Sequence, residues 1–319
     1  MSASVLISNL HSPPVLAFAA GVAAIGFRSD LKIPEQIYQG LAIYLLIAIG
    51  FKGGIALSDT NLSSISMPTA ATILIGASVS IATLYFTKVF IFKDWTNAGA
   101  LAAHYGSVSA VTFIACITFL ETKSIPYEGF MTAMMAIMEI PAIVIGLALA
   151  KYHSKEKDSK LKAILMETLT GKSVFLLATG LIIGASAGPI GAEKAAPFLI
   201  QPFYGVLIIF LLEMGLTAGR SMKNFGNLRG KLIAFAIVAP LVNGFIGVII
   251  GKFIGLSIGG STLLGTLAAS ASYIAAPAAV RIALPQANAG YYVFTSLGVT
   301  FPFNLIIGIP IYYYIASSF

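Results

Sequence analysis

The stretch GSVSAV at Gly106–Val111 interrupts a long apolar tract with small and polar residues, and ASASYI at Ala269–Ile274 does the same in a second tract. Each stretch places two serines two residues apart. Polar backbone left unpaired at membrane depth is costly and survives only where protein, water or a ligand satisfies it. The repeated pattern therefore indicates two related interruptions inside membrane-spanning segments, at Ser107 and Ser109 and again at Ser270 and Ser272.

The composition predicts a polytopic membrane protein. Of 319 residues, 58% are hydrophobic and only 10% are charged, whereas soluble domains average about 25% charged residues. Apolar tracts near the ~20 residues needed to cross a bilayer recur from end to end. The formal net charge of +7 then indicates basic loops on the cytoplasmic side and not a nucleic-acid partner.

Glycines, prolines and charges divide the chain into ten predicted transmembrane helices, so the expected fold class is an all-α polytopic membrane protein. Each segment is apolar and long enough to approach the thickness of the hydrocarbon core. The predicted segments are Val5–Phe27, Ile37–Leu57, Pro68–Phe92, Thr96–Leu120, Pro126–Tyr152, Ser173–Ile190, Ala195–Gly219, Gly230–Ile254, Ser261–Leu284 and Ala289–Ser317.

The basic residues orient these ten segments. If both termini lie on one face, 15 of the 19 Lys and Arg residues lie on the opposite face. An excess of this kind marks the cytoplasmic side, so both termini are predicted outside. The terminal face keeps only Lys52, Lys123, Lys194 and Lys252.

Short matches between the two halves indicate an internal duplication. GFKGGIALSD at Gly50–Asp59 resembles GLTAGRSMKN at Gly215–Asn224, and EIPAIVIG at Glu139–Gly146 resembles TFPFNLIIG at Thr300–Gly308. Together with the serine stretches, these matches keep the same order and nearly the same offset. The predicted organisation is a first repeat at 1–151, a cytoplasmic linker at 152–172 and a second repeat at 173–319.

Each predicted repeat contains five helices. Because five is odd, the second repeat enters the membrane from the opposite side and lies inverted. Inverted repeats are common in secondary transporters, whose binding sites lie near the midplane between the repeats. The serine stretches fall in the fourth helix of each repeat, where a two-fold axis in the membrane plane would bring them together.

Such interrupted helices suit a small planar oxyanion. A half-helix N-terminus carries partial positive charge and free N–H donors, and the serine hydroxyls add further donors. The alternative is that these serines bond to helical carbonyls or permit close helix packing. The predicted anion-binding residues are Gly106, Ser107, Val108, Ser109, Ala269, Ser270, Ala271 and Ser272.

Anion uptake into a negative cell interior needs a coupled cation. Glu139 is a carboxylate at membrane depth, where ionisable groups are usually functional, and Pro141 is expected to break its helix and free carbonyl oxygens. The alternative for Glu139 is an interhelical hydrogen bond in its protonated form. Oxygen ligands suit a hard cation such as Na⁺, and the predicted ligands are Glu139, Thr112, Thr300 and Asn304.

Three stretches carry a family resemblance: HYGSVSAVTF from His104, SASYIAAPAAVRIALPQAN from Ser270 and SLGVTFPFNLIIGIPIYY from Ser296. They look like signature segments of the cyanobacterial-type sodium-dependent bicarbonate transporters, and the similarity extends over essentially the whole chain. The resemblance implies a core domain and a gate domain, and bicarbonate bound between the broken fourth and ninth helices.

The same resemblance implies Na⁺-coupled bicarbonate uptake across the cytoplasmic membrane by a homotrimer. Many cyanobacterial members have a trimeric PII-like regulator, but they also carry a longer central segment than the loop of about twenty residues at 152–172. Symport of another small anion, such as a short carboxylate, stays open, as does a passive anion channel. An intramembrane enzyme is disfavoured because the sequence offers no nucleophile–base pair or metal-ligand cluster at membrane depth.

Overall fold

The structure is a computed structural model that describes residues 11–58, 62–154, 166, 170, 172–221, 228–273 and 275–319. The start of the first predicted span and most of the predicted linker at 152–172 lie outside these residues. Every regular element in the described residues is a helix, which confirms the predicted all-α class.

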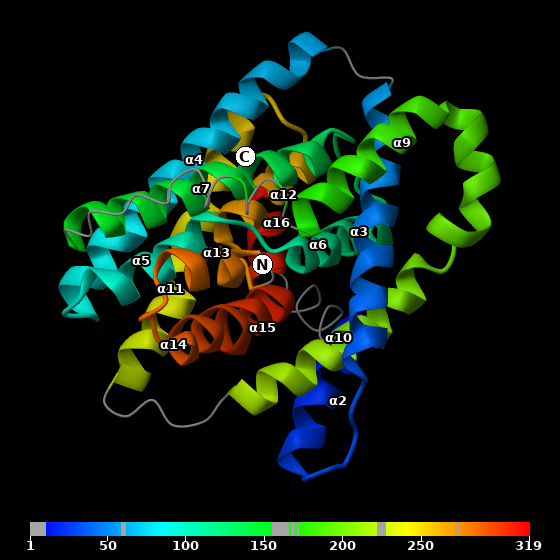
Figure 1. The fold of residues 1–319 in the computed structure, drawn as a ribbon. Helices are drawn as coiled ribbons and strands as arrows, with labels where there is room; N and C mark the ends of the chain where they lie inside the picture. The colour runs from blue at the N-terminus through cyan, green and yellow to red at the C-terminus, as the bar shows by residue number, and fades with distance from the viewer. Residues whose placement is uncertain are drawn as a thin grey trace.

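The first half of the chain contains six helices among the described residues (Figure 1). They are α2 (Pro13–Gly26), α3 (Glu35–Ser58), α4 (Leu62–Phe90), α5 (Trp95–Gly106), α6 (Ala110–Thr122) and α7 (Met131–Ser154). The helices α5 and α6 follow one another after a three-residue interruption at 107–109, and both are buried over most of their length.

The second half begins with α9 (Lys172–Ala195), the π-helical turn η1 (Ala196–Ile200), α10 (Phe203–Ser221) and α11 (Arg229–Phe253). A second interrupted pair follows, α12 (Ile258–Ala269) and α13 (Ala276–Ala283). The chain ends in one long rod with two π-helical segments: α14 (Ala289–Val293), η3 (Phe294–Thr300), α15 (Phe301–Phe303), η4 (Asn304–Gly308) and α16 (Ile309–Ser318).

Seven described helices are long and apolar enough to cross a membrane. They coincide with seven of the ten predicted spans, and the rod at Ala289–Ser318 and the pair at Trp95–Thr122 are among them. The other three predicted spans coincide with shorter apolar helices, at Pro13–Gly26, Phe175–Gly188 and Ile258–Ala269. The chain is therefore a multi-pass membrane protein, and a count of ten crossings stays a prediction.

Two boundaries differ from those predicted. The fifth span was expected to begin at Pro126, but α7 begins at Met131. The residues before it form a loop that contacts the start of α12. In that loop Ser124 has a φ of 54°, and the Glu128 carboxylate accepts hydrogen bonds from the backbone N–H (2.6 Å) and hydroxyl (3.1 Å) of Ser257. The loop thus holds the start of α12. In the sixth span Gly188, with a φ of 58°, bends the helix inside α9.

The helices pack in two groups. In one group α3 lies along α9 and α2 lies along α10. In the other group α4, α5 and α7 pack together, and α12 packs against both α11 and α16. Figure 1 shows the first group at one side of the molecule and the second at the other. Small residues on facing helices permit such close backbone approach inside membranes.

Two glycine pairs make the closest helix contacts of the first group. A Cβ placed on Gly50 of α3 would lie 3.0 Å from the Cα of Gly180 of α9, and the reverse holds at the same distance. A Cβ on Gly21 of α2 would lie 2.9 Å from the Cα of Gly215 of α10. Gly50 and Gly215 are the residues that the predicted internal duplication would place at equivalent positions, and each half contributes one member of each pair.

Candidate functional site

The first interruption separates α5 from α6 at Ser107–Ser109. Ser107, the residue after α5, has an extended backbone. The last residue of α5, Gly106, packs closely on α4: a Cβ placed on it would lie 2.5 Å from the Ser80 Cβ. Ser109 caps α6: its Oγ accepts hydrogen bonds from the Thr112 backbone N–H (3.1 Å) and the Thr112 hydroxyl (2.9 Å). A serine cap satisfies donors that a helix N-terminus leaves unpaired. The sequence therefore ends one helix and begins the next within three residues.

The second interruption separates α12 from α13. Ser270 is extended and follows the last residue of α12, Ala269. The Ser272 Oγ accepts a hydrogen bond from the Ala276 backbone N–H at 3.2 Å, at the start of α13. Pro277 is the second residue of α13, a position where its missing N–H has no cost. The same residue types thus build both interruptions.

The two interruptions touch. The Ser109 backbone N–H donates to the Ser270 Oγ at 3.0 Å, and the Ser272 backbone N–H donates to the His104 carbonyl oxygen at 2.8 Å. The structure therefore places the two stretches that contain the predicted anion-binding residues against one another, through Ser109, Ser270 and Ser272. The N-termini of α6 and α13 begin beside this contact, and all four serines are buried.

One hydroxyl at this contact, the Ser107 Oγ, is buried without a hydrogen-bond partner in the described part of the chain. The Tyr273 hydroxyl is also buried, and it lies beside Ser109. Buried polar atoms are paired in the large majority of cases, so each exception calls for an explanation. Both are hydroxyls next to helix N-termini, which is the donor set that a small anion requires.

Two of the four predicted cation ligands belong to the same contact. Thr112 bonds to Ser109, as described above, and the Asn304 amide Nδ2 donates to the Ala269 carbonyl oxygen at 2.9 Å. The Asn304 Oδ1 accepts from the Tyr312 hydroxyl at 2.8 Å. Asn304 therefore holds the end of α12 in place with its amide nitrogen while its amide oxygen points to a tyrosine.

Thr300 lies in the neighbouring η3 segment. Its Oγ1 donates to the Ala236 carbonyl oxygen at 2.7 Å and is also 2.7 Å from the Tyr105 hydroxyl. Thr300 therefore ties the terminal rod to α5 and α11. Both Thr300 and Asn304 are in or next to π-helical turns, which frequently occur at functional sites.

Glu139 lies apart from the other three predicted ligands. It is 3% exposed, and its carboxylate forms no hydrogen bond or ion pair with another residue that the structure describes. The expectation that Pro141 breaks its helix is wrong, because α7 is continuous from Met131 to Ser154 with the proline inside it. One turn further on, Ala142 faces Gly106: a Cβ placed on Gly106 would lie 2.9 Å from the Ala142 Cβ.

The π-helical turns and four aromatic partners were not predicted from the sequence. Tyr105, Tyr273 and Tyr312 supply hydroxyls to the region, and the His104 ring stacks on Tyr292 with centroids 4.4 Å apart. Tyrosines in an apolar chain are usually interfacial, and the C-terminal aromatic cluster that includes Tyr312 suggested only that role. Burial of these tyrosines becomes visible only when the helices are assembled.

A cavity of about 280 Å³ runs beside α6. It lies between α6, the start of α2 and the residue Tyr204 of α10, and it reaches Leu305 next to Asn304. Lys123 lines its end away from the interruption. The cavity therefore extends from the end of α6 that is predicted to face outside to Leu305, the residue after Asn304. Its lining is Ser12, Pro13, Pro14, Val15, Ala115, Thr118, Phe119, Thr122, Lys123, Tyr204, Leu305 and Ile309.

An ion pair joins the two groups of helices near the same end of α6. Lys52 of α3 donates to the Glu121 carboxylate at 2.7 Å. The Tyr127 hydroxyl donates to the same oxygen at 3.1 Å. Lys52, which the sequence placed on the terminal face, is thus paired with a carboxylate.

A comparison of the chain with curated proteins finds no match. The family described as the Na⁺-dependent bicarbonate transporter superfamily matches residues 13–317, which include both interruptions and the terminal rod. This is a family of transporters and not of enzymes. The match covers nearly the full sequence, and the chain therefore belongs to the Na⁺-dependent bicarbonate transporter superfamily.

Proposed function

We propose that the protein is a Na⁺-coupled symporter that carries bicarbonate into the cell across the cytoplasmic membrane. The observation that carries this proposal is the contact between the two interrupted helices, with the buried Ser107 hydroxyl, which has no hydrogen-bond partner among the described residues. Membership of the Na⁺-dependent family supports the coupling ion and the substrate class.

The proposed bicarbonate site comprises Gly106–Ser109 and Ala269–Ser272. The positive ends of α6 and α13 begin beside this site, and a helix N-terminus is equivalent to roughly half an elementary charge. The Ser107 hydroxyl, unpaired among the described residues, and the neighbouring Tyr273 hydroxyl are the proposed side-chain donors. Bicarbonate is small and planar, and it accepts hydrogen bonds on each of its oxygens. Because the serines are buried, entry of the ion requires the surrounding helices to move.

The proposed architecture is two inverted five-helix repeats with both termini outside. Each half contributes one glycine to each close pair, Gly50 with Gly180 and Gly215 with Gly21. Two-fold symmetry between the repeats would produce this pattern. In this proposal α2, α3, α9 and α10 form the gate domain and the remaining helices form the core domain. Assembly as a homotrimer and control by a PII-like partner belong to the proposal through the family resemblance alone.

The proposed transport step is movement of the core domain past the gate domain. The cavity beside α6 supplies a route from the outer side toward Asn304. Substrate and Na⁺ together shift the equilibrium between states only if they bind one state more tightly than the other. The ion pair between Lys52 and Glu121 joins the two domains and is formed in the state described.

We therefore expect a cross-link between positions 52 and 121 to stop transport. In a Cys116→Ala background, Lys52→Cys and Glu121→Cys are the only thiols, because the chain has one cysteine. A short bis-maleimide should abolish bicarbonate uptake by the double variant, while each single variant keeps its uptake after the same treatment. Undiminished uptake by fully cross-linked protein, measured in proteoliposomes, would show that α3 and α6 do not move relative to one another during transport.

The proposed Na⁺ ligands are Glu139, Thr112, Thr300 and Asn304. In the state described, Thr112 and Asn304 are at the interruptions and Glu139 is one turn from the residue that faces Gly106. Carboxylate, hydroxyl and amide oxygens near discontinuous helices are the donors that bind Na⁺ in transporters of this general construction. Glu139 is the only carboxylate of the set, so its removal should weaken ion binding most.

Replacement of Glu139 by alanine should raise the Na⁺ concentration for half-maximal bicarbonate uptake by at least tenfold. The physical reason is loss of the one negatively charged oxygen donor from the proposed site, where charged partners contribute more than neutral ones. The measurement is initial uptake against Na⁺ concentration at fixed bicarbonate. Glu35→Ala is the matched control, since Glu35 is an exposed carboxylate bonded to Gln39. An unchanged Na⁺ dependence would remove Glu139 from the ion site.

The proposal as a whole is tested by uptake of labelled bicarbonate into proteoliposomes with an imposed Na⁺ gradient. The pH is held fixed so that diffusion of CO₂ can be subtracted from empty liposomes. We expect uptake to depend on Na⁺, and excess acetate or sulfate to leave it unchanged. Strong competition by acetate would point to a short carboxylate as substrate, and flux that persists without Na⁺ would identify a channel.

A further inference from the structure

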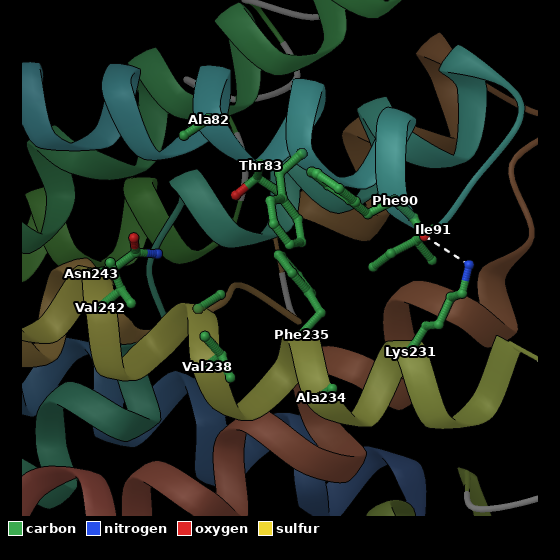
Figure 2. A pocket seen from close by; sticks show the side chains of 12 residues that line it. Ala82, Thr83, Phe90, Ile91, Lys231, Ala234, Phe235, Val238, Val242 and Asn243 are labelled. Atoms are coloured by element: carbon green, nitrogen blue, oxygen red, sulfur yellow. Dashed lines mark hydrogen bonds between the residues drawn. The ribbon is translucent and has the colours of Figure 1, made fainter.

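A surface groove of about 420 Å³ runs between α4 and α11, away from the interrupted helices (Figure 2). Residues of α4 and α11 line its two sides, and Ile91 follows the end of α4. The lining residues are Ala82, Thr83, Phe86, Phe90, Ile91, Lys231, Ala234, Phe235, Val238, Ala239, Val242 and Asn243. Nine of these twelve side chains are apolar, and the basic one lies at one end.

The groove has the length of one membrane leaflet. From Lys231 to Asn243 the helix advances twelve residues, or roughly 18 Å at the ordinary helical rise. Half of the hydrocarbon core is roughly 15 Å thick. Phe86, Phe90 and Val238 are exposed on the protein surface along this length, so the groove faces the bilayer. Its basic end lies on the side that the distribution of Lys and Arg predicts to be cytoplasmic.

The charged end of the groove is electropositive, and Lys231 has one hydrogen bond there among the residues that the structure describes. The Lys231 ammonium donates to the Phe90 carbonyl oxygen at 3.0 Å, and an ammonium has three donors. No acidic side chain occurs among the twelve residues that line the groove. At the same end, α11 begins without a side-chain cap on its first amides, and Arg229 is exposed there. These groups together present positive charge at the depth of the lipid headgroups.

We propose that an anionic phospholipid of the cytoplasmic leaflet binds in this groove. One acyl chain lies along Phe235, Val238 and Val242, and the phosphate lies at the Lys231 ammonium and the start of α11. The match in length accounts for the acyl chain, and the match in charge accounts for the selection of an anionic headgroup. The groove shares no residue with the proposed bicarbonate or Na⁺ sites, although Phe235 packs against Tyr105 of α5 with ring centroids 4.7 Å apart.

The test uses native mass spectrometry of the detergent-purified full chain with equal amounts of phosphatidylglycerol and phosphatidylcholine. We expect the protein to retain phosphatidylglycerol preferentially. Lys231→Gln should lower that preference about fivefold, as expected for one basic residue near an anionic lipid. Lys252→Gln is the matched control, because Lys252 lies at the opposite end of the same helix.

A second variant separates the groove from the charge. Val238→Trp fills the groove and should reduce retention of both lipids, whereas Ile246→Trp, at an exposed position of α11 outside the lining, should not. Equal retention of the two lipids by the unmodified protein would overturn the proposal. It would also be overturned if Val238→Cys formed a disulfide with a second copy of the chain in native membranes, because a protein would then cover the groove.

Discussion

Replacing Ser107 with alanine should lower bicarbonate uptake roughly 10- to 100-fold at low substrate without destabilising the protein. The Ser107 Oγ is buried and has no hydrogen-bond partner among the described residues, so its removal breaks no hydrogen bond within that part of the chain. A hydrogen bond to a charged group contributes about 1.5–3 kcal/mol, and each 1.4 kcal/mol is about tenfold in affinity. The measurements are the substrate dependence of uptake in proteoliposomes and the melting temperature.

Two variants make this test specific. Ser270→Ala removes the acceptor of the Ser109 backbone N–H, which leaves a buried donor unpaired at a cost of about 1–3 kcal/mol, so its melting temperature should fall. Ser317→Ala removes a hydroxyl that bonds within the last turn of α16 and should change neither property. Normal uptake by Ser107→Ala would show that this hydroxyl does not contact the substrate.

Replacing Gly54 with leucine should prevent accumulation of folded protein. A Cβ at Gly54 of α3 would collide with the carbonyl oxygen of Leu181 in α9. Overpacking a core commonly costs about 1–3 kcal/mol, and more where the neighbour cannot yield. Here the neighbour is helix backbone, which cannot rotate aside. The measurement is the monodisperse fraction of detergent-extracted protein in size-exclusion chromatography.

Gly40 provides the matched control on the same helix. It is exposed, and nothing lies within 4 Å of a Cβ placed there. Gly40→Leu should therefore yield as much monodisperse protein as the unmodified chain. A similar contact in the other pair of helices is between Gly21 and the carbonyl oxygen of Leu212, and Gly21→Leu should fail in the same way. A folded Gly54→Leu protein would show that α3 and α9 do not pack this closely.

The helical spans and the two interruptions were predictable because their signals are local. A membrane helix is a run of apolar residues, and Gly106 with its neighbouring serines departs from that pattern. The repeat of this pattern at Ser270 and Ser272 predicted that the stretches would meet, and Ser109 does contact Ser270. Sequence spacing was sufficient for this contact because the same short pattern of small and polar residues occurs in both stretches.

The remaining features depend on contacts between distant segments, which no local pattern encodes. Pro141 suggested a helix break, but packing of α7 against α4 and α5 keeps that helix continuous. The loop that contains Glu128 was assigned to a helix because nothing nearby reveals that Ser257 needs its carboxylate. Lys52 likewise gave no sign of its partner Glu121, 69 residues away.

The interlocking of the two halves has a consequence for biosynthesis. Ser58 ends α3, and Lys172 begins the helix that packs on it, so at 5–20 residues per second the ribosome needs roughly ten seconds to supply that partner. During this interval the glycine-lined faces of α2 and α3 meet lipid or insertion machinery instead of protein. Neither half can complete its helix packing before the other is made. The nascent chain therefore stays partly unpacked until α10 is synthesised.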